Sequence, residues 1–284
     1  MKILAIDTSG QQAGAAIMDE YITIGEIMIN AQSGPKTWHH SEILMPAIER
    51  LFTLSGLALA DMDYIAYTAG PGSFTGLRIG AATALGLARG INKPAIAVPT
   101  LDALAYNVLC TMPANNEESG EPSGLVIPLM DARRGQVYAA IYQLAPSGGL
   151  TRLTDYFAAS IEETLVQVNN FNNKSLPTIY LGDGADANKT TILSHHPSAK
   201  FAPPNANRQR PASAALCAIH QQRLVGATGL DRPQSCRIAD PIHSQNHGRP
   251  GAVAPTVQSP AILTQPVNLI YVRDPQAVRS AKKP

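Results

Sequence analysis

Short apolar runs alternate along this chain with stretches in which apolar residues recur at helical spacing. The short runs predict five strands, at residues 2–7, 13–18, 21–29, 64–68 and 94–98. The helical spacing predicts three helices, at residues 38–55, 75–89 and 100–109. Tight turns join the first three strands, which indicates an antiparallel arrangement, and Gly90 is expected to end the second helix as a left-handed cap.

The second part of the chain repeats this kind of pattern on a smaller scale. We expect a hairpin with strands 125–130 and 136–143, and then a strand at 178–182 followed by a turn at Asp183-Gly184. An apolar segment at 161–168 and a helix at 212–224 are expected to complete a reduced α/β half.

Changes in composition divide the chain into five parts. The predicted parts are an N-terminal half at 1–110, a linker at 111–123, a C-terminal half at 124–226, an insert at 227–262, and an edge strand with a basic tail at 263–284. The insert is rich in Pro, Gln, Ser, His and Gly and has no periodicity, so it is expected to be disordered.

Composition favours a globular cytoplasmic protein. Of the 284 residues, 45% are hydrophobic and 15% are charged, and no run of 18 apolar residues indicates a membrane span. The first apolar run reaches Asp7 too soon for a secretory signal. Cys110, Cys217 and Cys236 have no metal or redox spacing, and their odd number favours a reducing compartment.

The net charge of +1 conceals an asymmetry. Up to Asn207 there are 12 Lys and Arg against 18 Asp and Glu, whereas from Arg208 onward there are 10 against 3. The basic end either meets an anionic partner or is a solvated tail. Arg133 and Arg134, paired in a predicted turn, leave the same two alternatives open.

The rest of the chain is organised around the glycine-rich stretch at residues 70–80, which joins a buried strand to a helix. Its spacing fits neither a P-loop, which needs a lysine after the glycines, nor a dinucleotide fingerprint. In the helix, small residues recur every four positions, at Gly76, Gly80, Ala84 and Ala88. This ridge either seats the helix on its own sheet or allows close approach of a helix from another chain.

Residues 67–80 resemble the signature of the TsaB (YeaZ) family, the non-catalytic partner of the bacterial tRNA threonylcarbamoyladenosine (t6A) transferase. Four other segments also resemble that family, at residues 3–9, 40–46, 131–138 and 266–273. The resemblance covers residues 1–110 well, continues to about 225, and is absent from the insert.

The resemblance implies an α/β, actin-like ATPase (ASKHA) fold with two related halves, the second reduced. It also implies a dimerisation or scaffolding subunit needed for N6-threonylcarbamoylation of adenosine 37 in tRNAs that read codons starting with A. The implied partners are a TsaD-like catalytic subunit, a TsaE-like ATPase subunit, tRNA indirectly, and a second copy when the chain is alone.

The same resemblance suggests where nucleotide and metal would bind. In the actin-like fold the turn after the first strand cradles phosphates, which here means Asp7, Thr8, Ser9 and Gly10. The residues alone leave the alternative of a plain hairpin turn open. We expect no tightly bound cofactor, although ATP or ADP could bind at the interface of an assembled complex. The catalytic relative carries two metal-binding histidines where this chain has Thr100 and Leu104, so no metal site and no catalytic residue are predicted.

The remaining histidine pairs do not change this expectation. His39 and His40 are adjacent on a helix and point about 100° apart. His243 and His247 lie among prolines and a glycine.

A partner interface is predicted on the helices at 38–55 and 75–90. The apolar stripe of the first helix and the small-residue ridge of the second are expected to form one surface. Its members are His40, Leu44, Ile48, Leu51, Gly72, Phe74, Thr75, Gly76, Arg78, Gly80 and Ala84.

Three classes of function compete at this stage. The first is the partner-binding subunit, the second a stand-alone actin-like ATPase, sugar kinase or glycoprotease-like metallopeptidase, and the third a purely structural homodimer. A peptidase needs a metal or an activated nucleophile, and a kinase needs two phosphate loops, of which the sequence shows one weak candidate. The sequence therefore favours the binding subunit.

Overall fold

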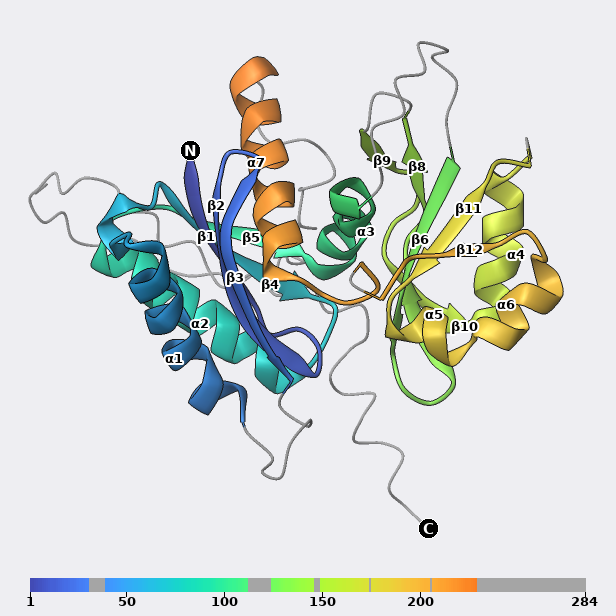
Figure 1. Ribbon diagram of the computed structural model, residues 1–284. Coiled ribbons are helices and arrows are strands. Elements are labelled where there is room, and N and C mark those ends of the chain that lie inside the picture. The colour runs from blue at the N-terminus through green and yellow to red at the C-terminus, as the bar shows by residue number, and fades with distance from the viewer. Residues whose placement is uncertain (31–38, 112–123, 146–148, 174, 205, 229–284) are drawn as a thin grey trace, which may run out of the picture.

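The computed structural model describes residues 1–30, 39–111, 124–145, 149–173, 175–204 and 206–228 (Figure 1). The predicted edge strand and basic tail lie outside these residues. So do the predicted insert beyond residue 228 and the linker beyond residue 111.

The first half is a five-stranded sheet with the order β3-β2-β1-β4-β5. Its strands are β1 (Lys2–Asp7), β2 (Gln12–Asp19), β3 (Ile22–Asn30), β4 (Tyr64–Gly70) and β5 (Ala95–Pro99). The first three strands are antiparallel, as predicted, whereas β4 and β5 run parallel to β1. The predicted α/β architecture is confirmed for this half.

Helices cover both faces of this sheet because its central strands are apolar on both sides. Leu4 and Ile6 of β1 face α1 (His40–Ser55) and α2 (Phe74–Gly90) in one core cluster. Ile3 and Ala5 face the opposite way, into a second cluster with α3 (Thr100–Thr111) and α7 (Pro211–Thr228). Successive β1 residues thus alternate between the two cores.

The second half is built around a seven-stranded sheet whose main path is β10-β7-β6-β11-β12, with β8 and β9 to one side. Its strands are β6 (Gly124–Asp131), β7 (Gln136–Ala139), β8 (Tyr142–Leu144), β9 (Leu150–Arg152), β10 (Phe157–Ser160), β11 (Thr178–Leu181) and β12 (Lys200–Phe201). Its helices are α4 (Ile161–Phe171), α5 (Asp183–Ala187) and α6 (Lys189–His195).

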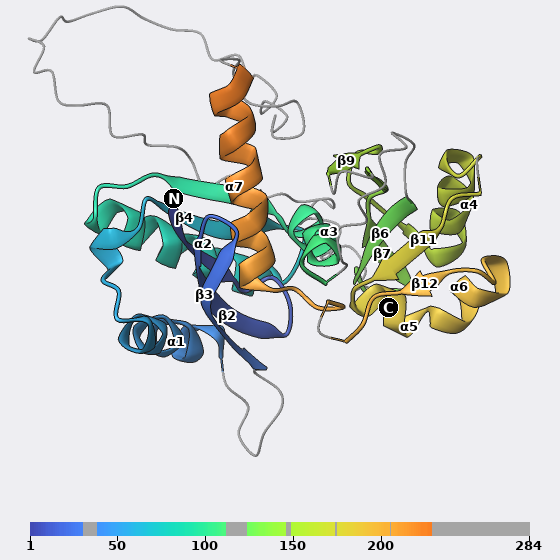
Figure 2. The same cartoon turned by 45° about the horizontal axis from the view of Figure 1, so that its top comes forward.

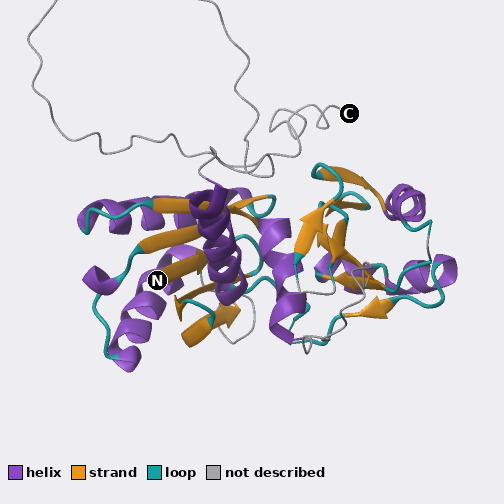
Figure 3. Cartoon of the chain, turned by 90° about the horizontal axis from the view of Figure 1, so that it is seen from above, coloured by secondary structure: helices purple, strands orange, loops and turns teal. Residues whose placement is uncertain are grey.

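The two halves share one local plan. Strand β6 ends at Asp131 and pairs antiparallel with β7 and parallel with β11, as β1 ends at Asp7 and pairs with β2 and β4. The turn that follows Asp131 is the counterpart of the loop that follows Asp7. The predicted fold of two related halves is therefore confirmed. Figure 3 shows their strands as two groups, with helices on the outer sides and also between the groups.

Helix α7 belongs to the first half, not the second. Its buried alanines and Ile219 pack against β1, β4 and β5, and Figures 1 and 2 show it standing against the first sheet. The prediction that this helix completes the C-terminal half is wrong. Small residues let α7 lie close to the sheet. Because these residues do not form an apolar stripe on one side of the helix, the sequence does not show which sheet the helix packs against.

Three local predictions also need correction. Gly90 is the last residue of α2 and does not have a positive φ, and the helix is capped by the N–H of Ile91. Asp183-Gly184 begins helix α5 instead of forming a turn. The predicted strand 136–143 is divided into β7 and β8, which pair with different ends of β6.

Candidate functional site

The loop after β1 begins with Asp7, whose carboxyl group is buried at the end of the strand. Asp7 Oδ1 accepts hydrogen bonds from Ser9 N–H at 2.9 Å, from Ser9 Oγ at 2.6 Å and from Thr68 Oγ1 at 3.1 Å. Burial raises the pKa of Asp7, and these hydrogen bonds oppose that rise. Asp7 Oδ2 is buried without a hydrogen-bond partner among the described residues. Asp7 therefore organises its own loop with one oxygen.

The glycine-rich start of α2 packs directly on this loop. Ser73 N–H donates to the Ser9 carbonyl at 2.7 Å, and Thr8 Oγ1 donates to the Gly76 carbonyl at 2.8 Å. A Cβ would overlap an oxygen of Thr8 or Ser9 at three positions: Gly72, Gly76 and Gly80. Of the two interpretations of the small-residue ridge, the structure supports packing of α2 against its own sheet.

The predicted partner surface therefore needs correction. Leu44, Ile48 and Leu51 are at most 3% exposed and lie in the core cluster between α1, α2 and the first sheet. Ala84 lies in the same cluster, and Gly76 and Gly80 are covered by Thr8. The prediction that the stripe and the ridge form an open surface is wrong, because the first sheet already buries both.

The other predicted interface residues lie near the start of the two helices. Phe74, Thr75 and Arg78 are exposed, and the Arg78 guanidinium lies over the Phe74 ring at 3.8 Å from its centre. His40 is half-buried with its ring beside Gly76, and Gly72 lies against Ser9. Partner binding by these residues stays a prediction.

An open apolar groove lies beside α1 and α2, next to the short helix η1 (Leu59–Asp61). It encloses about 440 Å³ and is lined by Met45, Ile48, Glu49, Phe52, Thr53, Leu57, Leu59 and Leu87. Met45 is 47% exposed, so it offers apolar surface to a partner. Of these lining residues, only Ile48 is among the predicted interface residues.

The loop does not fit a nucleotide phosphate as it stands. Thr8 and Ser9 are at most 1% exposed. The Gln209 amide oxygen lies 3.0 Å from the position that a Gly10 Cβ would take. A phosphate needs open backbone N–H groups, and this loop is covered on both the α2 side and the Gln209 side. Binding of ATP or ADP by an assembled complex stays a prediction.

The two positions aligned with the relative's metal histidines are used for packing. Thr100 Oγ1 accepts a hydrogen bond from Gly70 N–H at 3.1 Å, and Leu104 is fully buried beside Gly182. Among the described residues, no group of three or more His, Cys, Asp or Glu side chains could hold a metal ion.

A buried carboxylate near those positions was not predicted from the sequence. Asp102 Oδ1 on α3 accepts hydrogen bonds from Tyr142 OH at 2.5 Å and Tyr156 OH at 2.8 Å, and Arg152 Nη1 lies 4.0 Å away. Burial raises the pKa of Asp102, and the two tyrosine hydroxyls oppose that rise. The cluster ties α3 to the second half, so its role is structural.

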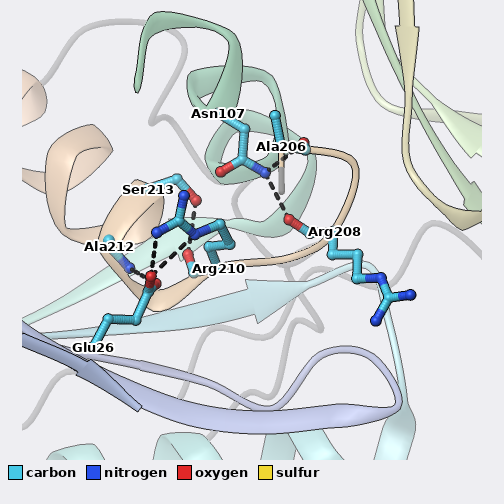
Figure 4. A network of polar contacts seen from close by, with 7 residues as sticks. All are labelled: Glu26, Asn107, Ala206, Arg208, Arg210, Ala212 and Ser213. Atoms are coloured by element: carbon cyan, nitrogen blue, oxygen red, sulfur yellow. Dashed lines mark hydrogen bonds and ion pairs between the residues drawn. The ribbon is translucent and has the colours of Figure 1, made fainter. Parts of the chain in front are cut away.

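A second feature that sequence analysis missed is the polar network where the chain enters α7 (Figure 4). It joins Asn107 and Glu26 to residues 206–213, which we call the strap. Asn107, a polar residue in the mainly apolar helix α3, is the signal that could have indicated it.

In the part of the chain that the structure describes, no helix has the length and apolar composition that crossing a membrane requires.

Comparison with known proteins gives consistent matches. A family model described as "TsaD: tRNA N6-adenosine threonylcarbamoyltransferase" matches residues 36–151. The tRNA threonylcarbamoyladenosine biosynthesis protein TsaB of Bacillus subtilis is 33% identical over 192 residues, which are 68% of this chain and 75% of that protein. The Escherichia coli protein of the same name is 35% identical over 148 residues, which are 52% of this chain and 58% of that protein.

A solved structure, YeaZ from Pseudomonas aeruginosa, has the same fold. It superposes with a TM-score of 0.56 at 23% sequence identity, covering 78% of this chain and 92% of that chain.

Proposed function

Because this chain belongs to the TsaB (YeaZ) family, we propose that it acts in the biosynthesis of threonylcarbamoyladenosine in tRNA as a subunit that binds a TsaD-like transferase. The observation that carries the proposal is the 33% identity over three quarters of the Bacillus subtilis protein. In this proposal the chain binds the transferase and is required for its activity. The substrate of the transferase is adenosine 37 of tRNAs that read codons starting with A.

The residues at the aligned metal positions support a non-catalytic role. Threonine and leucine cannot replace two imidazoles on a transition metal. Thr100 is already engaged with Gly70, and Leu104 fills the core between the halves. The chemistry of the transfer is therefore assigned to the partner.

The groove beside α1 and α2 is the surface that we assign to the TsaD-like partner. The TsaD family model matches residues 36–151, so the partner carries a counterpart of this helix pair. Two related surfaces can pair face to face about a pseudo-twofold axis, as identical surfaces do in a symmetric dimer. In the absence of the transferase, a second copy of this chain occupies the same groove. A TsaE-like ATPase and tRNA join the assembled complex, with tRNA contacted indirectly.

Reconstitution tests this function. The chain, the TsaD-like protein of the same cell, a TsaE-like protein and unmodified tRNA are combined with a threonylcarbamoyl donor, and t6A is measured by mass spectrometry. We expect t6A only when this chain and the transferase are both present. Modification that proceeds equally well without this chain, or by this chain without the transferase, would refute the proposal.

A further inference from the structure

The strap, residues 206–213, is anchored in the second half by one side chain. Asn207 Oδ1 accepts a hydrogen bond from Gly182 N–H at 2.6 Å, and Asn207 Nδ2 donates to Asp186 Oδ2 at 2.6 Å. Asn207 is 6% exposed. Both ends of its amide are thus used to hold the strap against the β11–α5 junction.

A second anchor comes from α3, which lies between the halves. Asn107 Nδ2 donates to the carbonyl of Ala206 at 3.0 Å and to the carbonyl of Arg208 at 2.6 Å, as Figure 4 shows. Asn107 is fully buried, and its bond to the Ala206 carbonyl is shielded from water, whereas the bond to the Arg208 carbonyl is part-buried.

The third anchor lies in the first half, on β3. The Arg210 guanidinium pairs with the Glu26 carboxylate, whose other oxygen accepts from Ala212 N–H at 3.0 Å (Figure 4). The Glu26 side chain is only 13% exposed. A partly buried carboxylate with a guanidinium and a helix N-terminal N–H as partners is a strong, directional contact.

Between these anchors the strap lies against the loop that follows β1. The Gln209 side chain packs on Gly10, and the Glu26 carboxylate is close enough to Asp7 to help raise its pKa. The strap therefore touches both halves and the loop at once.

We propose that the strap is a built-in latch. It locks the two halves in one orientation and keeps the Asp7–Gly10 loop covered, so that the conformation of the isolated chain does not respond to nucleotide. This inference concerns the chain itself and does not depend on the proposed function.

Hydrogen–deuterium exchange of the full-length chain, followed by mass spectrometry, tests the latch. Asn207→Ala leaves Gly182 N–H and the Asp186 carboxylate without their partner. We expect exchange in the β11–α5 junction and also in the loop at 7–10, across the strap, to become about tenfold faster. The matched control is Asn172→Ala, whose side chain bonds Leu176 within the second half. It should speed exchange only near its own position.

A second variant keeps the test informative if Asn207→Ala unfolds. Gln209→Ala leaves the three anchors in place and removes only the cover over Gly10, so it should speed exchange at 7–10 and leave 182–186 unchanged. Unchanged exchange at 7–10 in a folded Asn207→Ala and in Gln209→Ala would overturn the latch. So would protection of the 7–10 loop in the wild-type chain by millimolar Mg·ATP.

Discussion

Gly80 of α2 lies directly against the side-chain hydroxyl of Thr8 at the end of β1, where a Cβ at position 80 would overlap Thr8 Oγ1. Thr8 is fully buried and its hydroxyl donates to the Gly76 carbonyl, so moving the hydroxyl aside would break a buried hydrogen bond. We expect Gly80→Ala to lower the free energy of unfolding by about 1–3 kcal/mol. Urea unfolding followed by circular dichroism measures this.

Gly86 provides the control on the same helix. A Cβ at Gly86 would meet no heavy atom within 4 Å. Gly86→Ala should therefore raise the free energy of unfolding by up to about 1 kcal/mol, because alanine favours the helix over glycine. If both variants changed the free energy of unfolding in the same direction, the contact between α2 and Thr8 would not be the cause of the change in Gly80→Ala.

This pair of residues also shows where sequence analysis reached its limit. Small residues four apart at Gly76, Gly80 and Ala84 have the same pattern whether a helix meets its own sheet or another chain. Only the position of Thr8, 68 residues away from Gly76, decides between the two. The two cores on either side of β1 were predictable, by contrast, because residues 3–6 are all apolar and successive side chains of a strand point to opposite faces.

The Asp102 cluster yields a prediction about stability. Asp102→Leu would leave two tyrosine hydroxyls, those of the buried Tyr142 and the half-buried Tyr156, without their acceptor. We expect this change to lower the free energy of unfolding by at least about 2 kcal/mol. Asp102→Asn keeps an acceptor oxygen at nearly the same place and should cost about 1 kcal/mol or less. Thermal or urea unfolding that ranks the two variants as equal would contradict the hydrogen-bonding role.

A pH dependence follows from His196 in the second half. Its Nδ1 lies 2.5 Å from Tyr180 OH and its Nε2 lies 2.9 Å from Asn169 Oδ1. A neutral ring satisfies both partners, with Nε2 donating and Nδ1 accepting. Burial, and then the charge of the neighbouring His195, lower the pKa of His196 below its ordinary value of 6.5.

The sign of the effect is set by which state binds more protons. As the pH falls, His196 takes up its proton at a higher pH in the unfolded chain than in the folded chain. The contribution of neutral His196 to stability is therefore complete above about pH 6.5 and is lost as the pH falls through the folded-state pKa. We expect His196→Gln to show a smaller loss of stability between about pH 7.5 and 5.5 than the wild type does. Urea unfolding at both pH values measures this, with His39→Gln at an exposed position as the control. An equal loss in the wild type and in His196→Gln would rule out this residue as the source.

The placement of α7 and of the groove shows why parts of the candidate site were not predictable. Ala212, Ala214 and Ala215 are all buried although they lie on different sides of the helix, so the alanines indicate no preferred face. Met45 on α1 and Leu87 on α2 each lie at the edge of the apolar side of their helix. The sequence pattern alone does not tell which apolar residues of these helices the sheet leaves uncovered. The packing of α7 and the uncovered residues of the groove both depend on how each helix is rotated about its axis against the sheet.

The groove yields the prediction that bears most directly on function. Met45 is 47% exposed in the groove lining, so a charge at this position should not disturb the fold of the isolated chain. In a complex it would bury an unpaired carboxylate in apolar surroundings. We therefore expect Met45→Glu to weaken binding of the TsaD-like partner by more than about tenfold, which corresponds to about 1.4 kcal/mol. Sedimentation of the mixture and the yield of t6A are the measurements.

Val166→Glu is the matched control, because Val166 is 61% exposed on α4 of the other half. If Met45→Glu folds and binds as the wild type does, or if Val166→Glu weakens binding equally, the partner surface lies outside this groove.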